Sequence, residues 1–128
     1  LTALMLFRGL LTNMKTTEEK AIEIAKLMQD GKGENVTLID ISGLNSWTDY
    51  FVIVTVTSST QQQGLAKQIK EYIKENDLEV HPVNRRSPNG EDWELIDLGA
   101  IVIHLMSAQA REFYNLEKLW FNGKIISL

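Results

Sequence analysis

Apolar residues recur at two spacings along the chain, and the longer spacing predicts three helices. In these segments apolar side chains return every three to four positions, as one face of a helix requires. The segments are residues 16–33, 58–77 and 107–121. Each begins at a hydroxyl side chain that is suited to cap it: Thr16 with Glu19 three positions later, Ser58 or Ser59, and Ser107.

Shorter runs rich in β-branched and aromatic residues predict strands. They cover residues 35–42, 50–57, 78–83, 93–97 and 100–106. The second run is apolar almost throughout, so we expect a strand that is covered on both faces. Pro82 places the third run at a sheet edge. Leu98 and Gly99 predict a tight antiparallel turn between the last two runs.

The order of these elements is α-β-β-α-β-β-β-α, which predicts an α/β or α+β fold with a mixed sheet of about five strands flanked by helices. Residues 14–128 are expected to form one domain that starts naturally at Met14. Residues 1–13 are expected to be a non-native or upstream extension. The tail, residues 122–128, fits none of the predicted elements.

Composition excludes some classes of function. The chain has 128 residues, a net charge of −4 and no cysteine, so it lacks disulfides and thiolate chemistry. An acidic chain is poorly suited to grip a phosphate backbone over a wide area, so we expect no sequence-specific nucleic-acid binding and favour a basic protein partner. No signal peptide or membrane span is apparent, and we expect a cytoplasmic protein without membrane contact.

The residue types of common active sites form no motif here. His104 lies inside the apolar run 100–106, which favours a buried structural histidine, and His81 does not share metal-ligand spacing with it. Nucleotidyl transfer needs paired carboxylates; Asp92 and Glu94 have the spacing but lack a preceding glycine-serine loop. We therefore expect no enzyme, no catalytic residue, no metal and no cofactor. A nucleotide-binding enzyme remains the rival interpretation.

Residues 91–120 have the composition of a binding surface, because Trp, Tyr and Arg dominate many interfaces. The segment contains Trp93, Arg111, Tyr114 and Trp120. A 3-then-4 spacing predicts that three side chains are instead buried along the last helix: Phe113, Leu116 and Trp120. Trp93 fits either a core or an interface. Arg111 needs a partner for its charge, which is either Asp49 or Asp97 within the chain, or a group on another molecule.

Two segments, WTDYFVIVTVTSSTQQQGLA (47–66) and DWELIDLGAIVIHLMSAQAREFYNLEKLW (92–120), carry an ordered set of motif positions. These are Asp49, Tyr50, Phe51, Val52, Ile53, Ser59, Gln62, Trp93, Leu95, Asp97, Gly99, His104, Arg111, Tyr114, Leu116, Glu117, Leu119 and Trp120. Together they closely resemble the Iojap-like family of bacterial ribosomal silencing factors, and the likeness extends from Thr16 to Trp120. Ala100 departs from the family pattern, since many members carry an acidic residue there.

The resemblance implies a translational repressor. Members of the family bind the large-subunit ribosomal protein fourteen and block association of the ribosomal subunits when nutrients are short. The resemblance also implies a nucleotidyltransferase-like core without the active site, and a homodimer, as several members form. A large-subunit assembly factor that uses the same docking site is the alternative.

The resemblance places the partner-binding surface after the polar loop and at the start of the last helix. The implied contact residues are Trp93, Leu95, Asp97, Leu98, Gly99, Arg111 and Tyr114. Trp93 is expected to anchor the partner, Asp97 to pair with a basic residue, and Gly99 to let the backbone turn and approach closely. Structural alternatives stay open, because Asp97 can cap the turn and Tyr114 can lie half in the core. His104 and the pair Asp49-Tyr50 are assigned mainly to structure.

Overall fold

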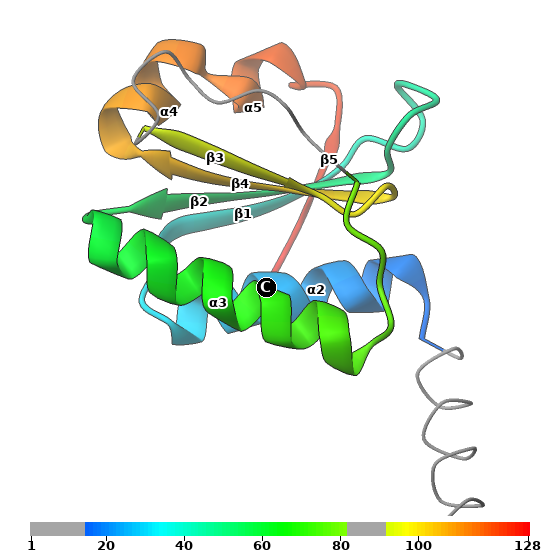
Figure 1. The fold of residues 1–128 in the computed structure, drawn as a ribbon. Coiled ribbons are helices and arrows are strands. Elements are labelled where there is room, and N and C mark those ends of the chain that lie inside the picture. The colour runs from blue at the N-terminus through cyan, green and yellow to red at the C-terminus, as the bar shows by residue number, and fades with distance from the viewer. Residues whose placement is uncertain (1–14, 82–91) are drawn as a thin grey trace, which may run out of the picture.

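A five-stranded mixed sheet forms the centre of the computed structural model, which describes residues 15–81 and 92–128 (Figure 1). The helices are α2 (Thr17–Asp30), α3 (Ser59–Glu75), α4 (Ala108–Tyr114) and α5 (Leu116–Leu119). The strands are β1 (Glu34–Asp40), β2 (Tyr50–Val56), β3 (Trp93–Asp97), β4 (Ile101–Ser107) and β5 (Lys124–Ile126). The expected fold class is confirmed. The proposed extension, residues 1–13, and the polar loop after Pro82 lie outside the described residues.

The strands lie in the order β3-β4-β2-β1-β5. The central strands β2 and β4 run parallel, while the pairs β3-β4, β1-β2 and β1-β5 are antiparallel. The predicted turn between β3 and β4 is confirmed, since Leu98 N–H donates to the Ile101 carbonyl at 2.8 Å. Gly99 has a φ of +83°, which L side chains rarely adopt, so this turn requires glycine.

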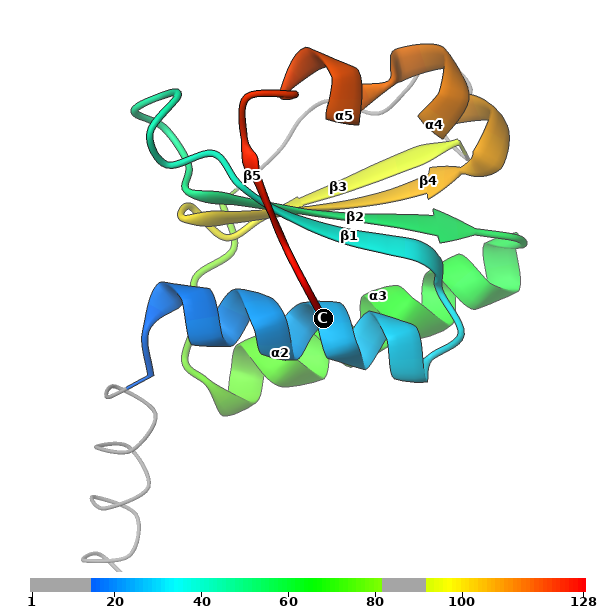
Figure 2. The ribbon, with the colours of Figure 1, turned by 180° about the vertical axis from the view of Figure 1, so that it is seen from behind.

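Helices α2 and α3 cover one face of the sheet, and α4 and α5 lie on the other face (Figures 1 and 2). The core under α2 and α3 is the larger one. Its fully buried side chains include Ile24, Met28, Leu38, Val52, Val54, Leu65, Ile69, Ile103 and Leu105. The core under α4 and α5 is smaller and contains Ile39, Ile41, Phe51, Ile53, Val102, Met106, Ala110 and Leu116. Strand β2 is therefore buried on both faces, as its composition predicts.

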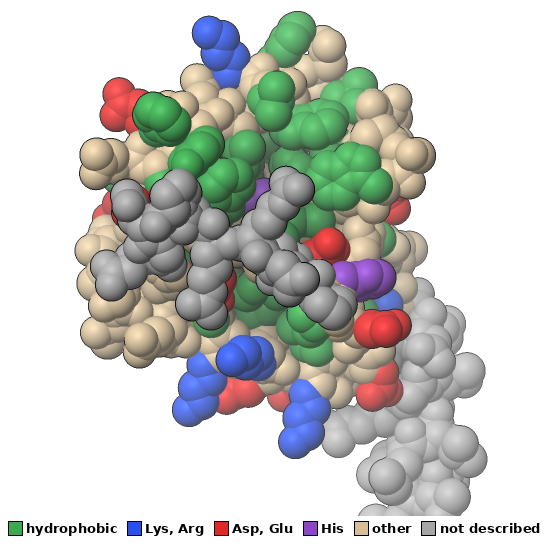
Figure 3. Space-filling model, turned by 45° about the horizontal axis from the view of Figure 1, so that its top comes forward, with side chains coloured by type: hydrophobic (Ala, Val, Ile, Leu, Met, Phe, Trp, Pro, Cys, Tyr) green, Lys and Arg blue, Asp and Glu red, His purple; other side chains and the backbone are tan. Residues whose placement is uncertain are grey.

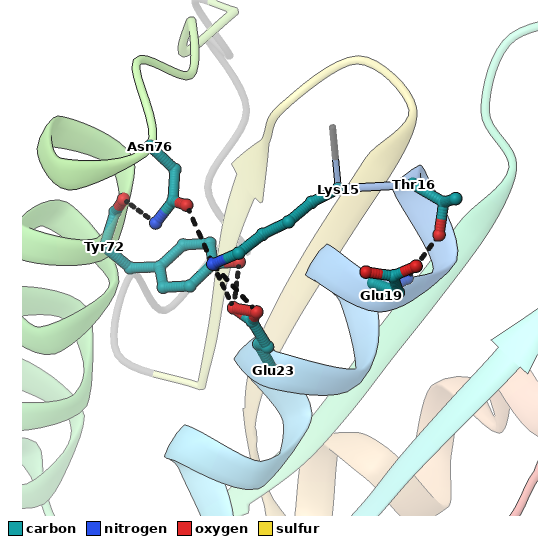
Figure 4. A network of polar contacts seen from close by, with 6 residues as sticks. All are labelled: Lys15, Thr16, Glu19, Glu23, Tyr72 and Asn76. Atoms are coloured by element: carbon teal, nitrogen blue, oxygen red, sulfur yellow. Dashed lines mark hydrogen bonds and ion pairs between the residues drawn. The ribbon is translucent and has the colours of Figure 1, made fainter. Parts of the chain in front are cut away.

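A polar cluster joins the start of α2 to the end of α3 (Figure 4). The Glu23 carboxylate accepts from Lys15 Nζ at 3.1 Å and from the Tyr72 hydroxyl at 3.0 Å. Burial and the neighbouring Glu23 carboxylate raise the pKa of Tyr72 well above its usual range, so its hydroxyl stays a donor. The N-cap predicted at Thr16 is confirmed, because its hydroxyl accepts from Glu19 N–H. The cluster ties the two long helices together.

Three expectations about local structure are wrong in part. The strand expected at 78–83 is reduced, in its described residues, to an isolated bridge between His81 and Asp97. The tail, left without an element, forms β5 at the opposite edge of the sheet. The last helix is broken, because Asn115 adopts a left-handed conformation (φ 46°, ψ 60°) that ends α4 and starts α5. Asparagine is one of the few residues that tolerate this conformation.

The described helices include none that is both long and apolar enough to cross a bilayer.

Candidate docking surface

Large apolar side chains remain exposed on the α4 and α5 side of the sheet (Figure 3). We call this surface the aromatic face and define it by the half-buried Trp93 together with Trp47, Phe113, Tyr114, Leu119 and Phe121. Phe113 is 80% exposed, Phe121 76% and Leu119 68%. Exposed apolar surfaces of this kind are typical of contact sites, since isolated domains rarely leave several neighbouring aromatic rings in water.

A series of ring contacts joins four members of the aromatic face, Trp47, Trp93, Tyr114 and Phe113, through Phe51 and His104. Trp47, in the loop before β2, contacts Phe51 with ring centroids 5.8 Å apart. Phe51 meets His104 edge-on at 4.6 Å. Trp93 then lies 4.7 Å from Tyr114, which contacts Phe113 at 5.0 Å. The rings support one another, so the exposed members are held by buried ones.

Trp93 is fixed by a hydrogen bond as well as by packing. Its indole Nε1–H donates to His104 Nδ1 at 3.0 Å. The pairing register places Trp93 opposite Met106, so His104 is its diagonal neighbour on the same face of β4. Trp93 is half-buried, packed against the smaller core on one side and touching Tyr114 on the other. The interpretation of Trp93 as a core residue holds in part, and the part of its side chain that stays exposed leaves the interface interpretation open.

His104 is a buried neutral histidine, as its place in an apolar run predicts. Its side chain is 3% exposed, and burial lowers its pKa to about 3. An indole N–H can only donate, so His104 Nδ1 must be the unprotonated acceptor and the proton lies on Nε2. Among the described residues, Nε2 has no hydrogen-bond partner.

Two other implied contact residues lie at the far end of β3. Asp97 is four residues from Trp93, about 13 Å along an extended strand. Its carboxylate accepts from Gly99 N–H at 2.8 Å, so the turn-capping alternative is confirmed. A Cβ on Gly99 would lie 3.0 Å from His81 Nε2, which leaves little room there.

The remaining implied contact residues lie on different faces of the sheet. Leu95 packs against the smaller core, on the same face of β3 as Trp93. Leu98 packs against the larger core, under α2 and α3. Tyr114 is 39% exposed and contacts Trp93, so it belongs to the aromatic face. The structure thus brings together Trp93, Leu95 and Tyr114, while Leu98 lies apart from them.

Arg111 is turned into the molecule. Its Nε donates to the Glu117 carboxylate at 3.0 Å, and its side chain is only 11% exposed. The guanidinium also donates to the Asn35 carbonyl, to Thr55 Oγ1 at 3.0 Å and to Thr37 Oγ1 at 2.8 Å. Of the two alternatives, the charge of Arg111 is paired within the chain, and its partner is Glu117 instead of Asp49 or Asp97. Arg111 ties α4 to the irregular start of β1, where the register shifts between Glu34 and Thr37.

A polar hollow lies around Arg111 at the same end of the sheet. Its lining includes three carboxylates: Glu34, Glu112 and Glu117. A phosphate placed there would face these negative charges, while four of the five guanidinium N–H donors are already used within the chain. The hollow is thus poorly suited to hold a nucleotide phosphate.

The sequence alone does not predict several residues of the aromatic face. Phe113 is predicted in one buried stripe with Leu116 and Trp120, but the break at Asn115 places Phe113 in a different helix from Leu116, and Phe113 is exposed whereas Leu116 is buried. Leu119 and Phe121 follow the same break, and Trp47 belongs to a loop without periodicity. The asparagine after Tyr114 was the available signal, because it favours a helix end.

This arrangement defines an α+β domain with an exposed aromatic face. Residues 14–127 match the family described as "Ribosomal silencing factor during starvation", RsfS. The chain is 34% identical over 107 residues to the ribosomal silencing factor RsfS of Bacillus subtilis, covering 81% of this chain and 86% of that protein. It is 30% identical over 108 residues to the chloroplastic protein Iojap of Zea mays, covering 84% of this chain and 46% of that protein.

A crystal structure of a protein from Chromobacterium violaceum has a similar fold. Its TM-score is 0.73 at 26% identity, and the likeness covers 89% of this chain and 92% of that one. The chain therefore belongs to the RsfS family of ribosomal silencing factors, as its motifs indicate.

Proposed function

We propose that this protein binds the large-subunit ribosomal protein fourteen through its aromatic face and thereby blocks association of the ribosomal subunits. The exposed rings over α4 carry the proposal, because Phe113 and Tyr114 lie beside a tryptophan that is already held in place. Trp93 is the proposed anchor, with Leu95 beside it on the same face of β3. Such preorganised aromatic side chains commonly supply most of the affinity of an interface.

Charge supports a basic partner. The chain carries a net charge of −4, which speeds encounter with a positively charged surface and suppresses non-specific contact with ribosomal RNA. The Asp97 carboxylate accepts from Gly99 N–H in the free protein and retains further lone pairs for a basic residue. The proposed contribution of Asp97 is therefore orientation rather than affinity.

A nucleotide-binding enzyme is the less favoured function. The polar hollow beside Arg111 presents carboxylates where phosphates would need donors. An assembly factor remains compatible with the same docking surface. An assembly factor and a silencing factor would differ only in the stage at which the protein meets the large subunit. We favour occlusion because relatives such as the Bacillus subtilis protein are named ribosomal silencing factors.

Sedimentation with purified large subunits tests the proposed binding. We expect the protein to travel with the large subunit in a sucrose gradient and not with the small subunit. Purified ribosomal protein fourteen should compete for it in solution. A protein that stays at the top of the gradient, with a magnesium-dependent nucleotide signal in calorimetry, would instead support the enzyme.

Trp93→Ala gives the sharpest single change at the proposed anchor. We expect binding to the large subunit to weaken by about 2 kcal/mol or more, as is typical of an interface hot spot. Because Trp93 is half-buried, circular dichroism must show that the variant is folded. Loss of the fold, with unchanged affinity of the remaining folded fraction, would make Trp93 a core residue only.

A further inference from the structure

We infer that His104 is a positioning residue for docking: its buried Nδ1 holds the indole of Trp93 in the orientation that presents the aromatic face to the partner. This inference rests on the proposed function. It assigns a binding role to a side chain that lies beneath the surface and cannot itself touch a partner.

The first argument is geometric. His104 lies in the middle of the sheet, opposite Leu95 on β3 and opposite Ile53 on β2. Backbone pairing on both sides fixes its Cα, and the edge-on contact with Phe51 at 4.6 Å restricts its ring. The acceptor that faces Trp93 therefore belongs to one of the most constrained side chains of the α4 and α5 side.

The second argument is chemical. The indole carries a single donor, and the hydrogen bond from Nε1 at 3.0 Å sets the direction in which the ring plane lies. The indole also meets Tyr114, with ring centroids 4.7 Å apart. Without the acceptor, packing alone would hold Trp93, and the indole could rotate towards water.

Two substitutions separate orientation from packing. His104→Leu keeps a side chain of similar size and removes the acceptor, whereas His104→Asn keeps an acceptor near the position of Nδ1. Met106→Leu is the matched control, because Met106 is fully buried in the same core, opposite Trp93, and has no polar contact with it. Each variant is measured as the full chain, by nuclear magnetic resonance of the indole N–H groups and by binding to purified large subunits.

We expect the indole N–H signal of Trp93, assigned with Trp93→Phe, to move upfield in His104→Leu and to exchange faster with solvent. Affinity for the large subunit should fall about three- to ten-fold, the value of one hydrogen bond. His104→Asn should recover part of both effects, and Met106→Leu should leave both unchanged. The thermal midpoint of His104→Leu should stay close to that of the wild type.

Each possible contrary result would contradict a different part of the inference. Equal affinity of His104→Leu and the wild type, with a shifted indole signal, would overturn the positioning role and leave the proposed function standing. An equal loss of affinity in Met106→Leu would mean that packing, and not the hydrogen bond, sets the orientation. If the wild type fails to bind large subunits, the proposed function falls and this inference falls with it. Should His104→Leu not fold, His104→Phe removes the same acceptor and is measured in its place.

Discussion

The two faces of the sheet are covered to different extents. On one face, α2 and α3 have 14 and 17 residues and bury the larger core. On the other, α4 and α5 have 7 and 4 residues. Helices this short leave large side chains such as Phe113 and Leu119 in water. We infer that the α2 and α3 face supplies most of the stability, and that the aromatic face is free to bind.

Truncation of a side chain on the α2 and α3 face should cause the largest loss of stability. Ile69 of α3 is fully buried in the larger core. Ile69→Ala should lower the free energy of unfolding by about 2–5 kcal/mol, because it removes apolar contacts and leaves a cavity. Urea denaturation measures the loss. The folded fraction should still bind the large subunit as the wild type does; an equal loss of intrinsic affinity would mean that the two faces are not separable.

Acid should destabilise the protein through the α4 and α5 side. Unfolded histidine binds a proton near pH 6.5, whereas burial keeps His104 neutral down to about pH 3. The unfolded state therefore binds more protons over this range, and stability falls as the pH drops. From pH 7 to pH 5 the contribution of His104 should fall by about 2 kcal/mol.

Urea denaturation at both pH values checks this contribution against His104→Asn, which cannot take up that proton. The wild type should lose more stability than the variant between the two values. Identical losses would show that His104 is not held neutral in the folded protein.

Exposed leucines on the two sides of the sheet should show the smallest effects and provide the most specific comparison. Leu119 lies on α5 and is 68% exposed, whereas Leu128 ends the chain after β5 and is 38% exposed. Neither Leu119→Ala nor Leu128→Ala should change the free energy of unfolding by more than about 0.5 kcal/mol. Only Leu119→Ala should weaken binding to the large subunit, by about 1 kcal/mol. Equal effects would remove Leu119 from the docking surface.

Local signals in the sequence were sufficient for most of the fold. Thr16, Ser58 and Ser107 cap helices as their side chains predict, and β2 is buried on both faces. Strand β5 was missed because three residues at a sheet edge carry too little pattern to be recognised. The break at Asn115 was missed because the apolar spacing continues through it, while the backbone does not.

The docking surface could be predicted only in part, because its contacts join residues that are distant in sequence. Trp93 and Tyr114 are both contact residues that the family resemblance implies, and the structure brings them together. The hydrogen bond from Trp93 to His104 follows from the β3-β4 register, which the spacing of single residues does not specify. Arg111 reaches Asn35 and Thr55 through tertiary packing, so its inward orientation has no local signal.

Light scattering of mixed ribosomal subunits tests the central claim most directly. Small and large subunits are mixed with increasing amounts of this protein, and the amplitude of joining is recorded. We predict that the amplitude falls with a midpoint near the dissociation constant for the isolated large subunit, and that Trp93→Ala moves this midpoint upward. A protein that binds the large subunit while the joining amplitude stays constant would contradict occlusion and favour an assembly role.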